Sequence, residues 1–202
     1  MSNPFEIRIS SGRLVDLSNF TEEDICLESI SRSLNNIIRF TGHYRDKEPL
    51  TVAQHTGLTM RISRALYPDD VASYLYCLIH DFPEAYYGDH SSPLKRYLGK
   101  NLDDLKKIDG VIVNKLFFFD KKYLPQAHER SKRCDQISLR IEQAMMWNDR
   151  SYLENLPEED QGFCDRSPIG DWYEDLQDRH LYLDSTYNTL KQRNISEIKE
   201  VA

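Results

Sequence analysis

The chain has few of the features that mark membrane, secreted or redox proteins. No apolar stretch approaches the length of a membrane span. The segment Met1–Glu6 lacks the basic and apolar regions of a signal peptide. The four cysteines, Cys26, Cys77, Cys134 and Cys164, are widely scattered and form no Cys-x-x-Cys pair, which argues against a zinc ribbon. We therefore expect a cytoplasmic protein with reduced thiols.

An excess of basic residues is also missing. The chain carries 26 Lys and Arg against 33 Asp and Glu, for a net charge of -7. This balance argues against a partner such as duplex nucleic acid, which needs a broad basic surface. A small anionic ligand is still allowed, because it requires only a local positive pocket. The 40% hydrophobic and 29% charged residues among 202 are typical of a soluble globular protein.

Apolar residues recur mostly at helical spacing. The pattern predicts helices over residues 27–39, 52–66, 69–81, 102–116, 126–147 and 171–192. Residues 1–20 predict a short strand or hairpin, Ser91–Lys95 a connector, and residues 157–170, with two prolines and two glycines, a surface loop. No repeat or linker is visible, so we expect one all-α domain over residues 1–202. Its core would span roughly 20–150, with the helix near 171–192 packed on it.

Charged residues crowd the end of the most apolar predicted helix. His80 and Asp81 follow the apolar run Leu75–Ile79, and Glu84 and Asp89 come soon after. Buried charge is costly unless it is paired or binds a metal. His55 and Asp135 lie in other predicted helices, so two imidazoles and two carboxylates could meet at one divalent ion. Such a mixed set suits Mn, Fe, Co, Ni or Zn better than Mg, although a single helical His is more often simply packed.

The order of several short motifs resembles a known family. Ile7–Leu14 (I-R-I-S-S-G-R-L), Arg39–His43 (R-F-T-G-H), Thr51–His55 (T-V-A-Q-H), Leu78–Asp89 (L-I-H-D-F-P-E-A-Y-Y-G-D) and Ser92–Lys95 (S-P-L-K) occur in sequence. Together with Asp135 they resemble the HD-domain superfamily of metal-dependent phosphohydrolases, in the subfamily of bacterial 5'-deoxynucleotidases and phage deoxynucleotide triphosphohydrolases. The resemblance spans roughly residues 5–145. It implies an all-helical fold, a divalent metal, a homo-oligomer, and a bacterial or phage-infected cytoplasm.

The resemblance also implies roles for individual residues. His55, His80, Asp81 and Asp135 would ligate the metal, and Glu84 and Asp89 would be catalytic. The substrate-binding residues would be Arg39, Phe40, His43, Lys95 and Lys132. Three departures from the family pattern stand out. Pro83 stands where many relatives have Ala, and His90-Ser91 replaces an apolar-Pro pair after G-D. Cys134 and Gln136 stand where the family often has Ala and Arg, and we expect these two changes to be neutral. Because proline usually begins a helix, we expect one helix to end near Asp81 and Glu84 to lie in the first turn of another.

Three basic groups exceed what one monophosphate requires. We therefore expect the substrate to be a deoxynucleoside triphosphate of dATP type, with release of triphosphate. The alternative is a 5'-deoxynucleotidase that acts on monophosphates. Each lysine could equally be a solvated surface residue. Two hypotheses from other functional classes stay open: a non-catalytic nucleotide-binding regulator, and an unrelated helical interaction domain.

Overall fold

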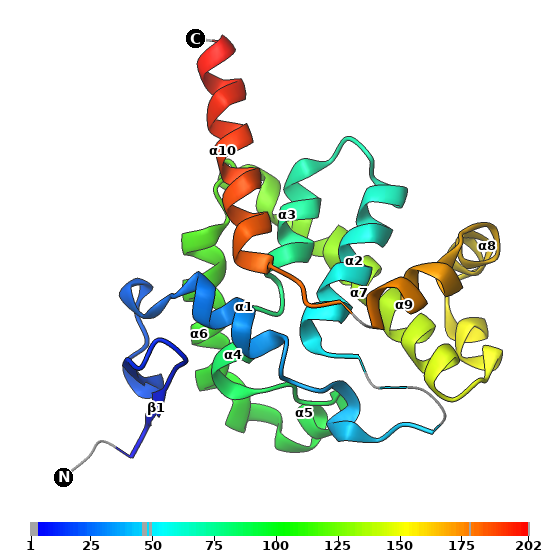
Figure 1. Cartoon of the computed structure of the whole chain (residues 1–202), viewed down its shortest axis with the longest axis horizontal. Coiled ribbons are helices and arrows are strands. Elements are labelled where there is room, and N and C mark those ends of the chain that lie inside the picture. The colour runs from blue at the N-terminus through cyan, green and yellow to red at the C-terminus, as the bar shows by residue number, and fades with distance from the viewer. Residues whose placement is uncertain (1–3, 46–47, 49, 178, 202) are drawn as a thin grey trace.

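The computed structural model describes residues 4–45, 48, 50–177 and 179–201. The chain is mostly α-helical, as expected, with one short N-terminal hairpin (Figure 1). In the hairpin, β1 (Glu6–Arg8) pairs antiparallel with β2 (Leu14–Asp16), and Ile7 faces Val15. Gly12 takes a φ of +87° in the connecting turn, a conformation that favours glycine. Val15 is fully buried, which fastens the hairpin to the helical core.

Three helices form the centre of the molecule (Figure 1). These are α2 (Val52–Leu66), α3 (Val71–Ile79) and α7 (Leu124–Met146), and each packs against the other two. Their starts are encoded locally. Thr51 and Gln54 form a capping box at α2, the Asp70 side chain caps α3, and Pro125 stands in the first turn of α7.

The remaining helices surround this central group. They are α1 (Leu27–Leu34), α4 (Glu84–Tyr87), α5 (Ser92–Leu98), α6 (Asp103–Leu116), α8 (Glu158–Arg166), α9 (Ile169–Gln177) and α10 (Leu183–Val201). Short 3-10 turns join several of them, η1 (Leu17–Asn19), η2 (Glu22–Asp24), η3 (Arg39–Gly42), η4 (Gly99–Leu102), η5 (Lys121–Tyr123) and η6 (Arg150–Asn155). α1 packs on α4 and α10, while α9 packs on α2 and α7.

The predicted helix over 27–39 is too long. α1 ends at Leu34, and Ile38 instead forms an antiparallel bridge with Thr51. The following Phe40 and Thr41 both have positive φ, near +55°. This pairing with the residue that caps α2 overrides the apolar spacing that favoured a longer helix, and it brings Arg39 back toward α2.

The C-terminal prediction is also wrong in two places. Residues 157–170 are not a loop, because Pro157 starts α8 and three acidic residues follow in its first turn. The expected helix over 171–192 is two helices, α9 and α10. Between them Leu181 donates its N–H to the Asn35 side chain (2.9 Å) and accepts from it (2.8 Å).

The segment Ser91–Lys95, which we expected to be a connector, instead begins α5.

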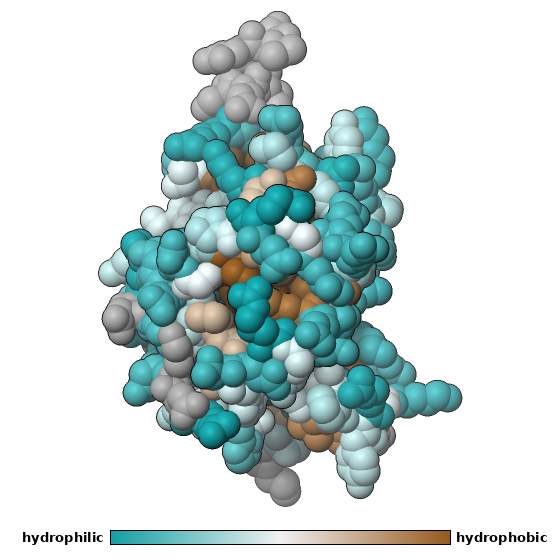
Figure 2. Space-filling view, turned by 90° about the vertical axis from the view of Figure 1, so that its right-hand side faces the viewer, coloured by the Kyte–Doolittle hydropathy of each residue, from teal (hydrophilic) through white to brown (hydrophobic). Residues whose placement is uncertain are grey.

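The face at the right of Figure 1 is mainly hydrophilic, with apolar side chains gathered near its centre (Figure 2). Among the helices in the described part of the chain, none is both long and apolar enough to cross a membrane.

Candidate metal centre

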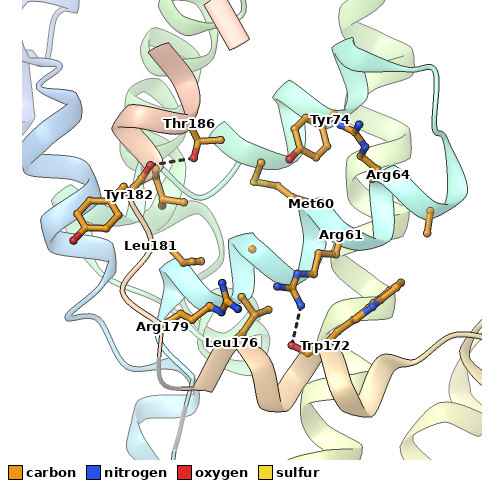
Figure 3. A pocket seen from close by; sticks show the side chains of 13 residues that line it. Met60, Arg61, Arg64, Tyr74, Trp172, Leu176, Arg179, Leu181, Tyr182 and Thr186 are labelled. Carbon is orange, nitrogen blue, oxygen red and sulfur yellow. Dashed lines mark hydrogen bonds between the residues drawn. The ribbon is translucent and has the colours of Figure 1, made fainter. Parts of the chain in front are cut away.

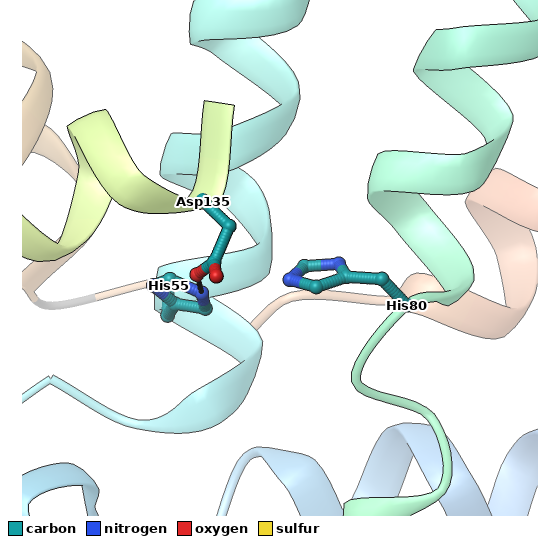
Figure 4. Close-up of side chains that lie close together, drawn as sticks. All are labelled: His55, His80 and Asp135. Atoms are coloured by element: carbon teal, nitrogen blue, oxygen red, sulfur yellow. Dashed lines mark ion pairs between the residues drawn. The ribbon is translucent and has the colours of Figure 1, made fainter. Parts of the chain in front are cut away.

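The central helices bring three predicted ligands together. His55 on α2, His80 at the end of α3 and Asp135 on α7 offer ligand atoms that all lie within 4.8 Å of one another. Figure 4 shows the ring of His80 pointing toward His55 and the Asp135 carboxylate. Asp81, the fourth predicted ligand, places Oδ2 3.4 Å from Nε2 of His55 and 3.1 Å from Nε2 of His80. We call these four residues the His/Asp cluster.

Both imidazoles are oriented through their other nitrogen. Nδ1 of His55 lies 2.6 Å from Oε1 of Glu142, and Nδ1 of His80 lies 2.7 Å from the carbonyl oxygen of Cys77. An Nδ1–H that donates in this way leaves Nε2 of a neutral ring as an acceptor. Both Nε2 atoms are buried and have no hydrogen-bond partner in the part of the chain that the structure describes. The two Nε2 atoms face carboxylates: His55 Nε2 lies 3.0 Å from Oδ1 of Asp135, and His80 Nε2 lies 3.1 Å from Oδ2 of Asp81.

The electrostatics of the cluster favour positive charge. Burial alone would lower the pKa of His55 and His80, but the surrounding carboxylates raise these pKa values to about 10 and about 9. Burial would raise the pKa of Asp81, and the two histidines and Arg39 instead hold it well below its usual range. A divalent cation would supply this positive charge in place of the imidazole protons, which it would displace.

The chain turns sharply after Asp81, as Pro83 predicts. α3 ends at Ile79 and α4 begins at Glu84, with Pro83 just before it at φ −57°. This turn buries Glu84 beside the cluster, where Oε1 lies 3.3 Å from Nζ of Lys95. Oε2 has no hydrogen-bond partner among the described residues. Burial, together with Asp81 and Asp89, raises the pKa of Glu84 to about 8.

Arg39 is a buried cation between two acidic residues. Its Nε lies 2.9 Å from Oε2 of Glu142, and its Nη1 lies 4.0 Å from Oδ2 of Asp89. Burial would lower the pKa of Arg39, but these carboxylates raise it above its ordinary value. The guanidinium also lies 5.4 Å from the ring centre of Phe40, which packs edge-on against Trp147. Arg39, Phe40 and Asp89 therefore sit together beside the cluster.

The other residues predicted to bind substrate are more exposed than Arg39 or make fewer contacts with the site. The residues His43, Lys95 and Lys132 are exposed. Lys95 still contacts Glu84 through its ammonium group. His90 is half-buried, with Nδ1 3.2 Å from the Gly88 carbonyl oxygen and its ring against Tyr87. Of the basic residues predicted to bind substrate, Arg39 is thus the one that is held most firmly.

Sequence reasoning missed Glu142. This residue is fully buried on α7 and joins two others of the site, because one carboxylate oxygen meets Nδ1 of His55 and the other meets Nε of Arg39. Ser138, one turn earlier on α7, lies 3.2 Å from the same Nδ1. A signal was present: Glu142 follows Asp135 by seven residues, about two helical turns, and so lies on the same face.

The donor set fits a transition-metal ion. His55, His80 and Asp135 can together hold a metal ion, and Asp81 lies within reach of both imidazoles. Neutral imidazole and carboxylate are ligands for Mn, Fe, Co, Ni and Zn. The Glu142–His55 contact is the hydrogen bond that commonly orients a ligating histidine.

Comparison with known proteins identifies relatives but attaches no activity to them. No protein-family model matches the chain. It is 37% identical over 109 residues to the Escherichia coli K12 protein named uncharacterized protein YfdR, covering 54% of this chain and 57% of that protein. It is 31% identical over 137 residues to uncharacterized protein RCAP_rcc00048 of Rhodobacter capsulatus, covering 67% of this chain and 69% of that protein. The chain therefore belongs to the same family as RCAP_rcc00048.

Proposed function

We propose that the protein is a divalent-metal-dependent phosphohydrolase that acts on 2'-deoxynucleotides. The observation that carries this proposal is the convergence of the His/Asp cluster. His55, His80 and Asp135 offer ligand atoms that all lie within 4.8 Å of one another, and Asp81 lies beside both imidazoles. Two imidazoles and two carboxylates placed in this way can bind one divalent cation, which would displace the imidazole protons. An interaction domain with incidental histidines would have no reason to retain this arrangement.

A bound divalent ion would supply Lewis-acid chemistry and lower the pKa of a water. The chain's own residues would do the rest. Glu84, whose pKa is about 8, holds a proton on a buried carboxyl group at neutral pH and can exchange it with substrate or water through Oε2. Asp89 holds the Arg39 guanidinium from one side, as Glu142 does from the other. Arg39 would then offset phosphate charge at the edge of the cluster.

The preferred substrate is a deoxynucleoside triphosphate, cleaved to deoxynucleoside and triphosphate. Arg39, Lys95 and Lys132 together would balance more negative charge than one monophosphate carries. One observation supports the alternative, a 5'-deoxynucleotidase. Lys132 is exposed on α7, whereas Arg39 and Lys95 contact carboxylates beside the cluster. Two basic groups are enough for one phosphate.

The test is a substrate panel. Purified protein loaded with Mn or Co would be given deoxy- and ribonucleotides as mono- and triphosphates, and the products would be identified. Release of triphosphate from deoxynucleoside triphosphates supports the first assignment, and release of phosphate from monophosphates supports the second. Metal binding without turnover of any nucleotide would sink the enzyme proposal and favour a nucleotide-binding regulator. Absence of metal binding would reject the site itself.

A further inference from the structure

A second cavity lies on the other side of α2. Two adjoining pockets of about 530 and 620 Å³ open between α2, α9 and the start of α10. They share lining residues, Arg64, Tyr74 and Tyr182 among them, so they form one continuous groove. Figure 3 shows the first pocket, with side chains from α2, α3, α9 and α10 around it. We call the combined lining the arginine groove.

The groove differs from the whole chain in the sign of its charge. Arg61, Arg64 and Arg179 line the first pocket, and the second adds His180 and Arg193. Among the described residues, neither lining contains an Asp or Glu. The chain as a whole has more acidic than basic residues. A concave surface that gathers cations in an acidic protein has the charge that an anionic ligand requires.

Some of these cations are held in place, which lowers the cost of ordering them around a ligand. Asp175 pairs with both Arg61 and Arg179, so one carboxylate lies between two guanidinium groups and leaves a net positive charge. Arg64 lies over the ring of Tyr74 at 5.8 Å and adds a second positive charge. The nearby Asp70 is paired with Arg130 on α7. Counted over the described lining residues and Asp175, the groove therefore keeps about two positive charges, and Arg193 places another cation at its far end.

The rest of the lining suits a planar ring. Met60 and Leu176 are buried and form an apolar floor. Trp172 is half-buried, and Tyr182 is 67% exposed at the mouth of the groove. Exposed aromatic side chains beside an apolar floor can stack on a ring, with their polar atoms left in water. Guanidinium groups pair with phosphate oxygens through two parallel hydrogen bonds.

The wall of the groove is packed against the core. Leu181 is fastened by two hydrogen bonds to Asn35. Gly57 allows Leu181 and Leu176 to approach α2, since a Cβ at that position would meet them at 2.7 and 3.2 Å. The groove is also separate from the His/Asp cluster. Arg64 follows His55 by nine residues, about two and a half turns, and so projects from the opposite side of α2.

We propose that the arginine groove is a second ligand site, for a small phosphorylated compound that carries a planar ring, such as a nucleoside triphosphate. The combined charge, ring surfaces and size select this class. The pocket volumes lie in the range of small-molecule sites. An inorganic anion would leave the aromatic surface unused, and a neutral ring compound would leave the arginines unmatched.

The experiment compares two double charge reversals in the full chain. Arg64→Glu with Arg193→Glu alters the groove, while Arg32→Glu with Arg150→Glu makes the same charge change at exposed residues elsewhere. Calorimetry would measure binding of ATP, dATP and inorganic triphosphate, and thermal unfolding would confirm that each variant folds. We expect nucleotide affinity to fall about tenfold or more in the groove variant and to stay unchanged in the control.

Two further measurements locate the ligand and test the ring. A photoreactive 8-azido-ATP should label peptides that contain Tyr74 or Tyr182. The Tyr182→Ala variant should bind ATP more weakly and should bind inorganic triphosphate as tightly as the wild type. An equal loss of nucleotide affinity in both charge-reversal variants would overturn the proposed site. So would labelling confined to peptides around His80 and Glu84. Equal affinity for ATP and inorganic triphosphate would overturn the ring assignment, and tighter binding of a single-stranded oligonucleotide would overturn the small-molecule assignment.

Discussion

The two sides of α2 carry opposite kinds of chemistry. On one side, the buried His55 faces the carboxylates of Asp81, which follows α3, and of Asp135 on α7, and the cluster favours a cation. On the other side, Arg61 and Arg64 face a groove that is open to solvent and favours an anion. The buried side is built by helix packing and buried hydrogen bonds, whereas the open side depends on the segment around Leu181. A chain with a net charge of -7 therefore contains two local sites that favour ligands of opposite charge.

This comparison predicts that changes on the cluster side abolish metal binding and turnover without altering the groove. Asp81→Ala removes a carboxylate that lies near both imidazoles. Turnover should fall by about 10³-fold, since metal centres supply several kcal/mol of charge stabilisation, and metal content measured by mass spectrometry should fall with it. Asp104→Ala, at an exposed ion pair on α6, is the matched control. Full activity of the Asp81 variant after chelation would refute the metal centre.

Glu84→Gln separates proton transfer from metal binding. The variant keeps the shape of the side chain but cannot ionise, so turnover should fall by roughly 10²-fold while metal content stays unchanged. In the wild type, a pKa of about 8 means that Glu84 loses its proton as the pH rises through that value. The wild-type rate should change through the same pH range and the variant should lack that step. Loss of metal from the variant would mean that Glu84 is a ligand instead.

Glu142→Gln tests whether the orientation of His55 matters. The change removes the charge that holds Nδ1 of His55 and Nε of Arg39. Because hydrogen bonds to a ligating histidine typically change metal affinity or activity by about 10- to 100-fold, a loss of that size is expected. Calorimetric titration with Mn or Co measures the affinity. Glu129→Gln, an exposed residue of the same helix, should have no effect.

Gly57→Ala acts on the groove side alone. The added methyl group would meet the side chains of Leu181 and Leu176, and overpacking of this kind costs about 1–3 kcal/mol. We expect a lower Tm and weaker nucleotide binding in the groove, with metal affinity kept. Gly110→Ala is the control, because its Cβ would meet nothing within 4 Å. Reduced metal affinity in the Gly57 variant would show that the two sides of α2 are coupled.

The smallest effect concerns Asp70, which caps α3 and pairs with Arg130 of α7. Burial would raise its pKa, but hydrogen bonds from Ser73 and Arg130 lower it below its ordinary value. A carboxyl group with a lowered folded-state pKa stabilises the fold above its unfolded-state pKa, and this stability is lost as the pH falls through the folded-state value. Asp70→Ala should therefore cost about 1 kcal/mol near neutral pH. The difference from wild type in urea unfolding should shrink below about pH 4.

The candidate site could be predicted in part because its residues stand in recognisable order. His80 and Asp81 end an apolar helix, and His55 and Asp135 lie in other predicted helices. The resemblance implies that these four residues are ligands of one metal, and the structure places all four together. Pro83 correctly indicated that Glu84 starts a new helix. Glu142 was missed because its importance depends on contacts with His55 and Arg39, which come from distant parts of the chain.

Local patterns in the sequence alone determined the helical class and the bounds of α2, because helical spacing and capping residues act within a few positions. Tertiary contacts decided where other helices stop. The bridge between Ile38 and Thr51 replaces the end of a predicted helix, and Asn35 binds Leu181 where another helix breaks. The packing of α2, α3 and α7 on one another brings His55, His80 and Asp135 together. The segment at Leu181 completes the wall of the arginine groove. These features require partners more than a hundred residues apart in some cases, which no local pattern encodes.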